Sequence, residues 1–273
     1  MVLHKISGLS RYVRYLEEVP AETDALYQDL LINVTGFFRE PETFGVLQKK
    51  VFPRLMKDRP GQTPIRVWVS GCSTGEEAYS IAMALTEFLN QNKTAVPIQV
   101  FATDVSETVI EKARTGIYPE NVLTGVSPER LRRFFVKGDG GYQVSRTIRD
   151  LCVFARQDVT KDPPFSRMDL ISCRNLLIYL NPSMQQRIIP TFHYALKPTG
   201  VLVLGASETI GQFGDLFSLL DKSHKIYTRK TALHRLRFEF PAGHVSSHKA
   251  EGGKAFPPAG GLGFDVQKEA DRI

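Results

Sequence analysis

The chain has 273 residues, of which 42% are hydrophobic, 10% aromatic and 23% charged. These proportions are those of a globular protein, and they exclude a collagen-like or wholly disordered chain. The length predicts one large domain, or one domain with a small companion. The formal net charge of +6 favours an anionic partner, but it does not distinguish nucleic acid, a membrane surface and an acidic protein.

Cysteine usage and the distribution of apolar residues indicate where the protein works. Cys72, Cys152 and Cys173 are odd in number and widely spaced, which favours neither a disulfide framework nor a zinc site. No run approaches the ~20 apolar residues of a membrane span, and the N-terminus lacks the apolar centre of a signal peptide. We therefore expect a cytoplasmic protein with no metal site and no direct membrane insertion.

The N-terminal region is predicted to be helical. Apolar residues recur at helical spacing over residues 9–16 and again over 26–34. A third helix is expected to begin at Pro41, since proline suits a first helical position. Pro53 is expected to end or kink this helix.

Alternating strands and helices are predicted further along the chain. Short β-rich runs, apolar on both faces as in buried parallel strands, span residues 65–70, 98–104, 151–156, 168–173 and 201–205. Helical patterns at 75–92, 107–115 and 183–196 separate some of them, with Ser106 as N-cap and Gly116 as the stop of the second. This alternation predicts an α/β fold with a doubly wound sheet.

Two segments depart from this alternation. Residues 117–150 contain two prolines and a Gly-Asp-Gly-Gly turn at 138–141, which predicts a small inserted antiparallel β-subdomain. The runs 216–221 and 224–230 are interpreted as a closing antiparallel pair. The expected organisation is a short helical cap and linker over 1–40, the main domain over 41–230 and a flexible Gly/Pro-rich linker or tail over 231–273.

The segment 67–77, Val-Trp-Val-Ser-Gly-Cys-Ser-Thr-Gly-Glu-Glu, places a turn of small residues between a strand and a helix. Small residues let a ligand approach the backbone, and the first turn of a helix offers N–H donors to an anionic group. A plain turn with the capping box Thr74-x-x-Glu77 explains the segment equally well. Gly71 and Gly75 do not complete a dinucleotide fingerprint, which disfavours an NAD site.

Polar side chains follow the predicted strands at the edge where open α/β sheets bind ligands. Asp104 suits the ribose hydroxyls of a nucleotide or the cap of the next helix, and Asp158 suits an adenine amino group or a plain turn. Arg174 and Asn175 add a guanidinium and an amide directly after the fourth strand. This convergence of polar groups favours a ligand site.

The tetrapeptide Asp162-Pro163-Pro164-Phe165 is similar to the D-P-P-[YF] signature of nucleic-acid amino methyltransferases. In those enzymes the signature follows the fourth strand, whereas here it precedes that strand. The basic residues are scattered and not interleaved with aromatic ones, as a base-stacking groove would require. We therefore expect no nucleic-acid partner.

Several separated motifs, in order, resemble the chemotaxis receptor glutamate O-methyltransferases of the CheR family. They are N-x-T-x-F-F-R at 33–39, G-C-S-T-G-E-E-x-Y-S at 71–80, A-T-D at 102–104, K-A-R-x-G-I-Y at 112–118 and C-R-N-x-x-I-Y at 173–179. The resemblance implies an S-adenosylmethionine-dependent (Rossmann-like) fold, with S-adenosyl-L-homocysteine as the product. It further implies methyl transfer to glutamate side chains on the cytoplasmic helical bundle of a chemoreceptor.

Site residues carried over by this resemblance divide into two sets. The residues matching the family's cofactor contacts are Asn33, Thr35, Arg39, Glu77, Asp104, Asp158, Val159, Arg174 and Asn175. Arg39 and Tyr179 resemble the catalytic pair that flanks the transferred methyl group. Arg39 is expected to hold a carboxylate, either that of the cofactor or that of the substrate.

Two features of this sequence depart from the family pattern. Only 32 residues precede Asn33, which is fewer than the family's usual N-terminal helical domain. The tail resembles the join in fused methylesterase, methyltransferase and sensor chains, so such domains are expected as fused or associated partners. A non-catalytic S-adenosylmethionine-binding module stays open as an alternative, and an amino methyltransferase is the third hypothesis.

Overall fold

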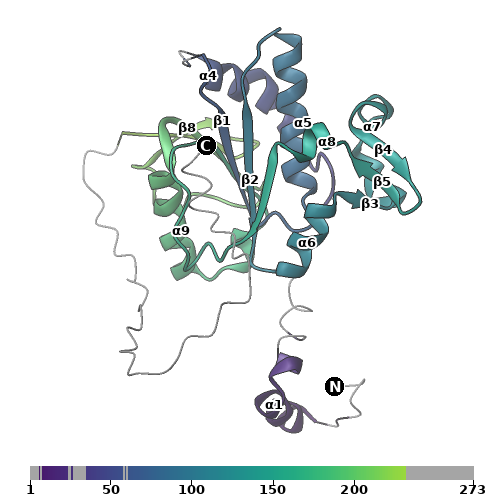
Figure 1. Ribbon diagram of the computed structural model, residues 1–273. Coiled ribbons are helices and arrows are strands. Elements are labelled where there is room, and N and C mark those ends of the chain that lie inside the picture. The colour runs from purple at the N-terminus through teal and green to yellow at the C-terminus, as the bar shows by residue number, and fades with distance from the viewer. Residues whose placement is uncertain are drawn as a thin grey trace, which may run out of the picture.

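The computed structural model describes residues 6, 8–23, 26, 35–57, 59 and 61–231. Helix α1 (Leu9–Glu18) confirms the first helical segment and is drawn below the sheet domain in Figure 1. Leu9 is 71% and Val13 47% exposed, so this part of the apolar stripe is not buried against the described residues. The predicted second helical segment, apart from Leu26, and the predicted tail, apart from Thr231, lie outside the described residues.

The helix predicted from Pro41 is interrupted and does not run straight. It consists of α3 (Pro41–Val46), the π-helical turn η1 (Leu47–Val51) and α4 (Phe52–Met56). Pro53 has no N–H to donate and its ring collides with the carbonyl of a regular α-turn, so a wider turn accommodates it. The N–H of Phe52 accordingly donates to the carbonyl oxygen of Leu47, five residues back.

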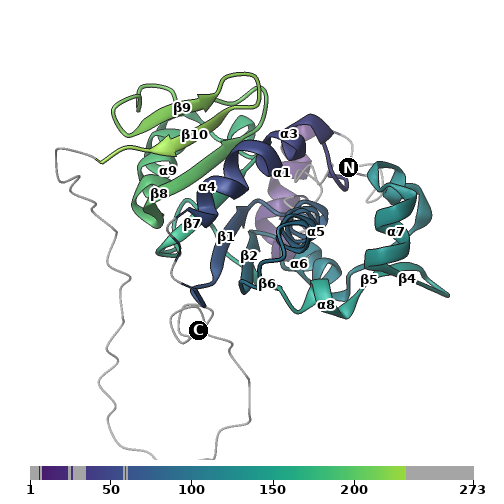
Figure 2. The ribbon, with the colours of Figure 1, turned by 90° about the horizontal axis from the view of Figure 1, so that it is seen from above.

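A seven-stranded sheet in the order β6-β2-β1-β7-β8-β10-β9 forms the centre of the molecule (Figures 1 and 2). Its strands are β1 (Ile65–Ser70), β2 (Ile98–Asp104), β6 (Cys152–Arg156), β7 (Met168–Cys173), β8 (Leu196–Leu204), β9 (Phe217–Asp221) and β10 (Ile226–Arg229). The first five pair in parallel, and β10 pairs antiparallel with both β8 and β9. The predicted doubly wound sheet and its closing pair are therefore confirmed.

Strand β8 begins five residues earlier than predicted. Leu196 pairs with Met168, and the register shifts between Met168 and Leu170. Such an irregularity tolerates Pro198 inside the strand, since proline cannot donate to a regular ladder. The sequence pattern places the strand start after this proline and so misses the first part.

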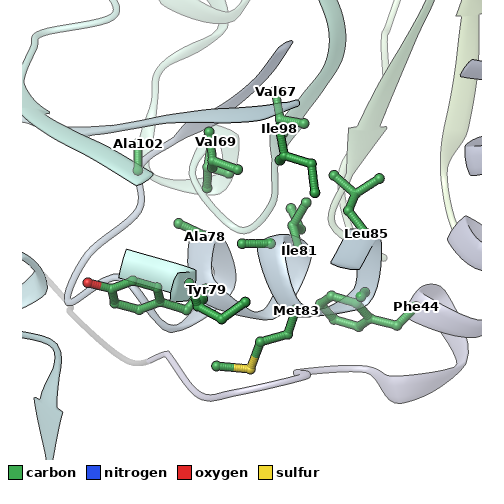
Figure 3. Packing of buried hydrophobic residues seen from close by; sticks show 14 of the residues in the cluster. Phe44, Val67, Val69, Ala78, Tyr79, Ile81, Met83, Leu85, Ile98 and Ala102 are labelled. Carbon is green, nitrogen blue, oxygen red and sulfur yellow. The ribbon is translucent and has the colours of Figure 1, made fainter. Parts of the chain in front are cut away.

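Helices cover both faces of the sheet because successive strand residues point to opposite sides. Val67 and Val69 of β1 pack against α5 (Glu76–Gln91), as Figure 3 shows. Trp68 points to the opposite face, where its ring meets Phe192 of α9 (Pro182–Ala195) at 5.4 Å between centroids. Helix α6 (Glu107–Thr115) ends at Gly116, whose φ of 63° confirms the predicted stop.

The insertion between α6 and β6 is the predicted small antiparallel subdomain. Its elements are β3 (Ile117–Tyr118), the 3₁₀ turn η2 (Glu120–Gly125), α7 (Pro128–Phe134), β4 (Phe135–Gly138), β5 (Gly141–Val144) and α8 (Arg146–Arg149), and its sheet order is β3-β5-β4. Figure 1 shows it beyond α5 and α6, away from α9. Helix α7 was not predicted, although Ser127 caps it by accepting from the N–H of Arg130. No helix in the described part of the chain is long and apolar enough to span a bilayer.

Candidate active site at the carboxyl edge of the sheet

The turn after β1 lies at the carboxyl edge, beside the ends of β2 and β7. Gly71, Ser73 and Gly75 all have positive φ, and the N–H groups of Gly71 and Cys72 donate to the Thr103 carbonyl oxygen. The hydroxyl oxygens of Ser70 and Ser73 are buried without a hydrogen-bond partner. Since buried hydroxyls are normally paired, these two groups are available to a polar ligand at this edge.

The predicted capping box at the start of α5 is wrong. The N-cap is Gly75, with φ 94°, and the hydroxyl of Thr74 donates to the carboxylate of Glu76 at 2.7–2.8 Å. Burial raises the pKa of Glu76 despite that hydrogen bond. Gly75 is also required for packing, because a Cβ there would lie 2.9 Å from the Cβ of Ala113.

Asp104 ends β2 and binds backbone on both sides. One oxygen accepts from the N–H of Ser73 at 2.9 Å, and the other accepts from the N–H of Ser106 at 3.1 Å. The carboxylate therefore fixes the turn after β1 and the backbone of Ser106, the N-cap residue of α6, but it makes no bond to the first turn of that helix. Each carboxylate oxygen has a second lone pair, so these bonds leave acceptor capacity for a ribose hydroxyl.

Asp158 lies in a tight local turn. Its Oδ1 accepts from the N–H and hydroxyl of Thr160 at 2.9 and 2.6 Å, and Lys161 lies 3.2 Å from its Oδ2. Partial burial opposes ionisation, but these hydrogen bonds and the Lys161 charge together hold the pKa of Asp158 below its ordinary value. The geometry therefore accounts for Asp158 as a turn residue, and its contact with adenine, like that of the half-buried Val159, stays a prediction.

The Asp-Pro-Pro-Phe tetrapeptide is part of the loop that leads into β7. Phe165 is 3% exposed and stacks on Phe101 at 5.0 Å between centroids. Asp162 accepts from the N–H of Asp158 at 2.7 Å, and the Pro163 carbonyl accepts from Gln157. This segment is structural.

Arg174 is the most connected side chain of the site. Its side chain is 2% exposed, and its NH1 and NH2 groups donate to Glu77 at 3.3 Å, to Glu40 at 2.9 Å and to the carbonyl oxygen of Arg39 at 2.8 Å. Glu77 also accepts from the hydroxyl of Ser172 at 2.6 Å. Both predicted cofactor residues, Arg174 and Glu77, thus bind protein groups in this structure, and Arg174 ties β7 to the backbone beside Arg39.

The segment 35–40 is held by aromatic packing. Phe37 is buried between Tyr118 and Phe135, at 4.8 and 5.3 Å between centroids. Phe38 packs on Phe44 at 5.1 Å, and the guanidinium of Arg130 lies 3.9 Å from its ring centroid. The two phenylalanines are therefore core residues, and they lie at the junction between the sheet domain and the inserted subdomain.

The two predicted catalytic side chains are at the surface. Arg39 is exposed, and Tyr179 is 53% exposed on the short 3₁₀ turn η3 (Leu177–Tyr179). Such exposure suits a protein substrate, which must reach the reacting atoms from outside. Thr35 begins this segment and is half-buried, whereas Asn33 lies outside the described residues.

Sequence reasoning missed three residues that organise this edge. Glu40 and Ser172 belong to the Arg174 network, and Glu208 accepts backbone N–H groups from Asn175 and Leu177 at 3.0 and 2.7 Å. Glu208 lies four residues beyond the end of β8, whereas Asp104 is the last residue of β2. A search of the loops just after the strands, and not only of the strand ends, would have found Glu208.

Cysteine and metal chemistry find little support in the described region. Burial is the main cause that raises the pKa of Cys72, Cys152 and Cys173, so their thiols stay protonated. No group of three or more His, Cys, Asp or Glu side chains among the described residues is arranged to hold a metal ion.

A cavity of about 370 Å³ lies at the opposite, amino edge of the sheet. The buried carboxylate of Asp169 lines it and pairs with Arg59 at 2.7 Å and with Lys197 at 3.0 Å. Asp169 also accepts from the backbone N–H of Arg66 at 2.8 Å. These bonds join the loop before β1 to β7 and β8, and so they explain the cluster as structural.

Fold and site together define a class of protein. The sheet is doubly wound, two serine hydroxyls at the end of β1 and in the turn after it have no protein partner, and an acidic residue ends β2. These features fit a nucleoside cofactor, and the motifs are those of S-adenosylmethionine-dependent methyltransferases. The family model "CheR methyltransferase, SAM binding domain" matches residues 33–226. The chain belongs to the CheR methyltransferase family, and S-adenosylmethionine is its cofactor.

Curated relatives agree with the family model. Chemotaxis protein methyltransferase 1 of Pseudomonas aeruginosa is 36% identical over 202 residues, covering 72% of this chain and 73% of that protein. The Pseudomonas putida chemotaxis protein methyltransferase Cher2 is 36% identical over 225 residues, covering 80% and 82%. An uncharacterized 104.1 kDa protein of Rhodobacter capsulatus is 38% identical over 227 residues, and there the chain spans 24% of the relative's length.

Proposed function

We propose that this chain transfers the methyl group of S-adenosylmethionine to glutamate side chains of chemoreceptors and so forms glutamate methyl esters. Membership of the CheR family and relatives named as chemotaxis protein methyltransferases support this proposal. The observation that carries it is the buried Arg174, which joins the end of β7 to the backbone at Arg39. That contact links the proposed cofactor edge to a residue exposed to a protein substrate.

The reaction needs little proton chemistry. A glutamate of pKa ~4.3 is more than about 99% ionised at pH 7, so no general base is required to generate the nucleophile. The carboxylate oxygen attacks the methyl carbon, the carbon–sulfur bond breaks, and its electron pair stays on sulfur to give S-adenosylhomocysteine. The charges of donor and acceptor cancel in this step, so the protein acts by alignment and by exclusion of water.

The candidate site residues have different proposed roles in aligning the cofactor and the substrate. We propose that Asp104 and Asn175 bind the cofactor directly, together with Asn33, Thr35, Asp158 and Val159. Arg174 pairs with Glu77 and also bonds to Glu40 and to the Arg39 carbonyl, so that it fixes the 35–40 segment. Arg39 holds a carboxylate with its two parallel donors, and the hydroxyl of Tyr179 directs a carboxylate oxygen.

The proposed substrate is the cytoplasmic helical bundle of a methyl-accepting chemoreceptor. On this proposal the chain works in the cytoplasm, where that bundle lies. Methylesterase and sensor domains, fused or associated, are further proposed partners, since an ester must be removed for the signal to be reset.

Radiolabelled methyl transfer tests the proposal. The full chain is incubated with methyl-labelled S-adenosylmethionine and isolated receptor signalling domains, and base treatment releases the label from esters as methanol. We expect base-labile label on the receptor domain, strongly reduced by Arg39→Lys and unchanged by Arg146→Lys, a matched change at an arginine that is 85% exposed on α8.

Two other outcomes would contradict the proposal, and each would indicate a different function. Cofactor binding with no transferred label would indicate a non-catalytic regulatory module. Base-stable label on RNA or DNA would indicate an amino methyltransferase.

A further inference from the structure

Glu208 is a buried carboxylate that the proposed reaction does not use. It is 4% exposed and follows β8 by four residues. Its Oε2 accepts from the N–H groups of Gly205 at 2.7 Å and Asn175 at 3.0 Å, and its Oε1 accepts from the N–H of Leu177 at 2.7 Å. Three backbone donors therefore converge on one charge.

These donors belong to the segment that carries two predicted site residues. Asn175 has φ 61°, a left-handed conformation that needs support from its surroundings. Leu177 is the first residue of η3, which ends at Tyr179, so Glu208 satisfies an N–H group at the start of that turn. One carboxylate thus fixes the backbone of Asn175 and the beginning of the turn with Tyr179.

The space around this contact is filled. A Cβ on Gly205 would lie 2.8 Å from Oε2 of Glu208, 2.9 Å from the Asn175 nitrogen and 3.1 Å from the Asn175 side-chain amide nitrogen. Contacts under 3.0 Å to a backbone atom cannot be relieved by a side-chain rotation alone. The segments that follow β7 and β8 therefore pack closely against each other at the carboxyl edge of the sheet.

We propose that Glu208 is a positioning residue for cofactor binding and methyl transfer, holding Asn175 and the Tyr179 turn in their working geometry. The proposal rests on the proposed cofactor site, because it acts through Asn175. Glutamine at position 208 cannot replace the carboxylate. Whichever way its amide is turned, an NH₂ group faces at least one backbone N–H, and that donor loses its acceptor.

The test compares binding of S-adenosylhomocysteine by calorimetry with steady-state methyl transfer, using the full chain and a receptor signalling domain. For Glu208→Gln we expect the Kd to rise about tenfold and kcat to fall about tenfold, while the KM for the receptor domain stays within twofold. The matched control is Asp169→Asn, which neutralises an equally buried carboxylate at the opposite edge of the sheet. It is expected to lower the melting temperature and to leave the Kd within twofold.

Two further variants keep the outcomes distinct. Asn175→Ala tests the site itself: an unchanged Kd would contradict the proposed cofactor site and the role of Glu208 with it. If Asn175→Ala weakens binding and folded Glu208→Gln binds normally, the role of Glu208 alone is overturned. If Glu208→Gln does not fold, Gly205→Ala decides, since it keeps the carboxylate but displaces Asn175; normal binding by that variant would overturn the proposal.

Discussion

Arg174 shows how one buried cation organises an active-site edge. Removing a guanidinium from water is costly unless its charge and donors are matched. Glu77 and Glu40 match the charge, and the Arg39 carbonyl accepts a further bond. The Nε of Arg174 is buried without a partner, but the bonds from its two terminal nitrogens hold the backbone beside Arg39 and so position a predicted catalytic residue.

Tyr179 is expected to act on the reacting groups and not on cofactor affinity. Tyr179→Phe removes the hydroxyl that directs a carboxylate oxygen, so we predict about a tenfold fall in kcat with the Kd for S-adenosylhomocysteine unchanged within twofold. The control is Tyr194→Phe on α9, where the tyrosine is 51% exposed against 53% for Tyr179. Equal kcat values for the two variants would show that Tyr179 is not a catalytic residue.

His193 makes stability depend on pH. Burial and the adjacent charge of Arg229 hold its pKa below the ordinary value, while its Nε2 lies 2.9 Å from the Lys230 carbonyl. The unfolded chain therefore binds a proton more readily than the folded one, and the free energy of unfolding falls as the pH drops below about 6.5. Urea unfolding at pH 7 and pH 5 should show a smaller fall for His193→Gln than for the wild type, and equal falls would contradict this assignment.

At the scale of elements, the inserted subdomain supports the segment that carries Arg39. Phe37 lies between Tyr118 and Phe135 of the subdomain, and Arg130 of α7 covers Phe38. Arg130 also forms a two-point ion pair with Glu87 of α5 at 2.8 Å. The insertion therefore contributes to the site even though its strands lie outside the main sheet.

Arg130→Met should weaken this junction. It removes the partly buried ion pair and the contact with the Phe38 ring, so we predict a loss of about 1–3 kcal/mol in the free energy of unfolding, measured with urea. Arg146→Met is the matched change, because its ion pair with Asp150 is 85% and 65% exposed and should contribute less than about 0.5 kcal/mol. A loss no larger than that of the control would show that Arg130 does not support the junction.

The sequence predicted the main elements better than the connections between them. Strands β1, β2 and β7 have the predicted bounds because each has an apolar centre that is followed by polar residues. The π-turn before Pro53 and the early start of β8 depend on how proline is accommodated in three dimensions, which periodicity does not encode. The same holds for the site: Asp104 and Asn175 are visible as strand-end residues, whereas the Arg174 ion pairs with Glu40 and Glu77 join positions far apart in the chain.

At the scale of the whole molecule, the amino and carboxyl edges of the sheet differ in how their polar side chains are bonded. The amino edge is closed by Asp169, whose partners Arg59 and Lys197 join the loop before β1 to β8. The carboxyl edge carries the buried serine hydroxyls that have no protein partner. The charged groups at the amino edge are paired with one another, whereas the carboxyl edge keeps polar groups that have no protein partner.

Asp169→Asn should be strongly destabilising. It leaves the buried charge of Arg59 without its counter-ion, so we predict a loss of about 3–5 kcal/mol in the free energy of unfolding by urea. Asp150→Asn, at a carboxylate that is 65% exposed, should change it by less than about 0.5 kcal/mol. If both changes cost the same, the cluster at the amino edge does not hold the sheet together.

A crystal structure of the full chain with S-adenosylhomocysteine tests the central claim most directly. We predict that the ligand lies at the carboxyl edge, with its ribose hydroxyls on Asp104 and its amino-acid end near Asn175 and Arg39. A ligand bound elsewhere, such as in the cavity beside Asp169, would contradict the proposed site and the mechanism built on it.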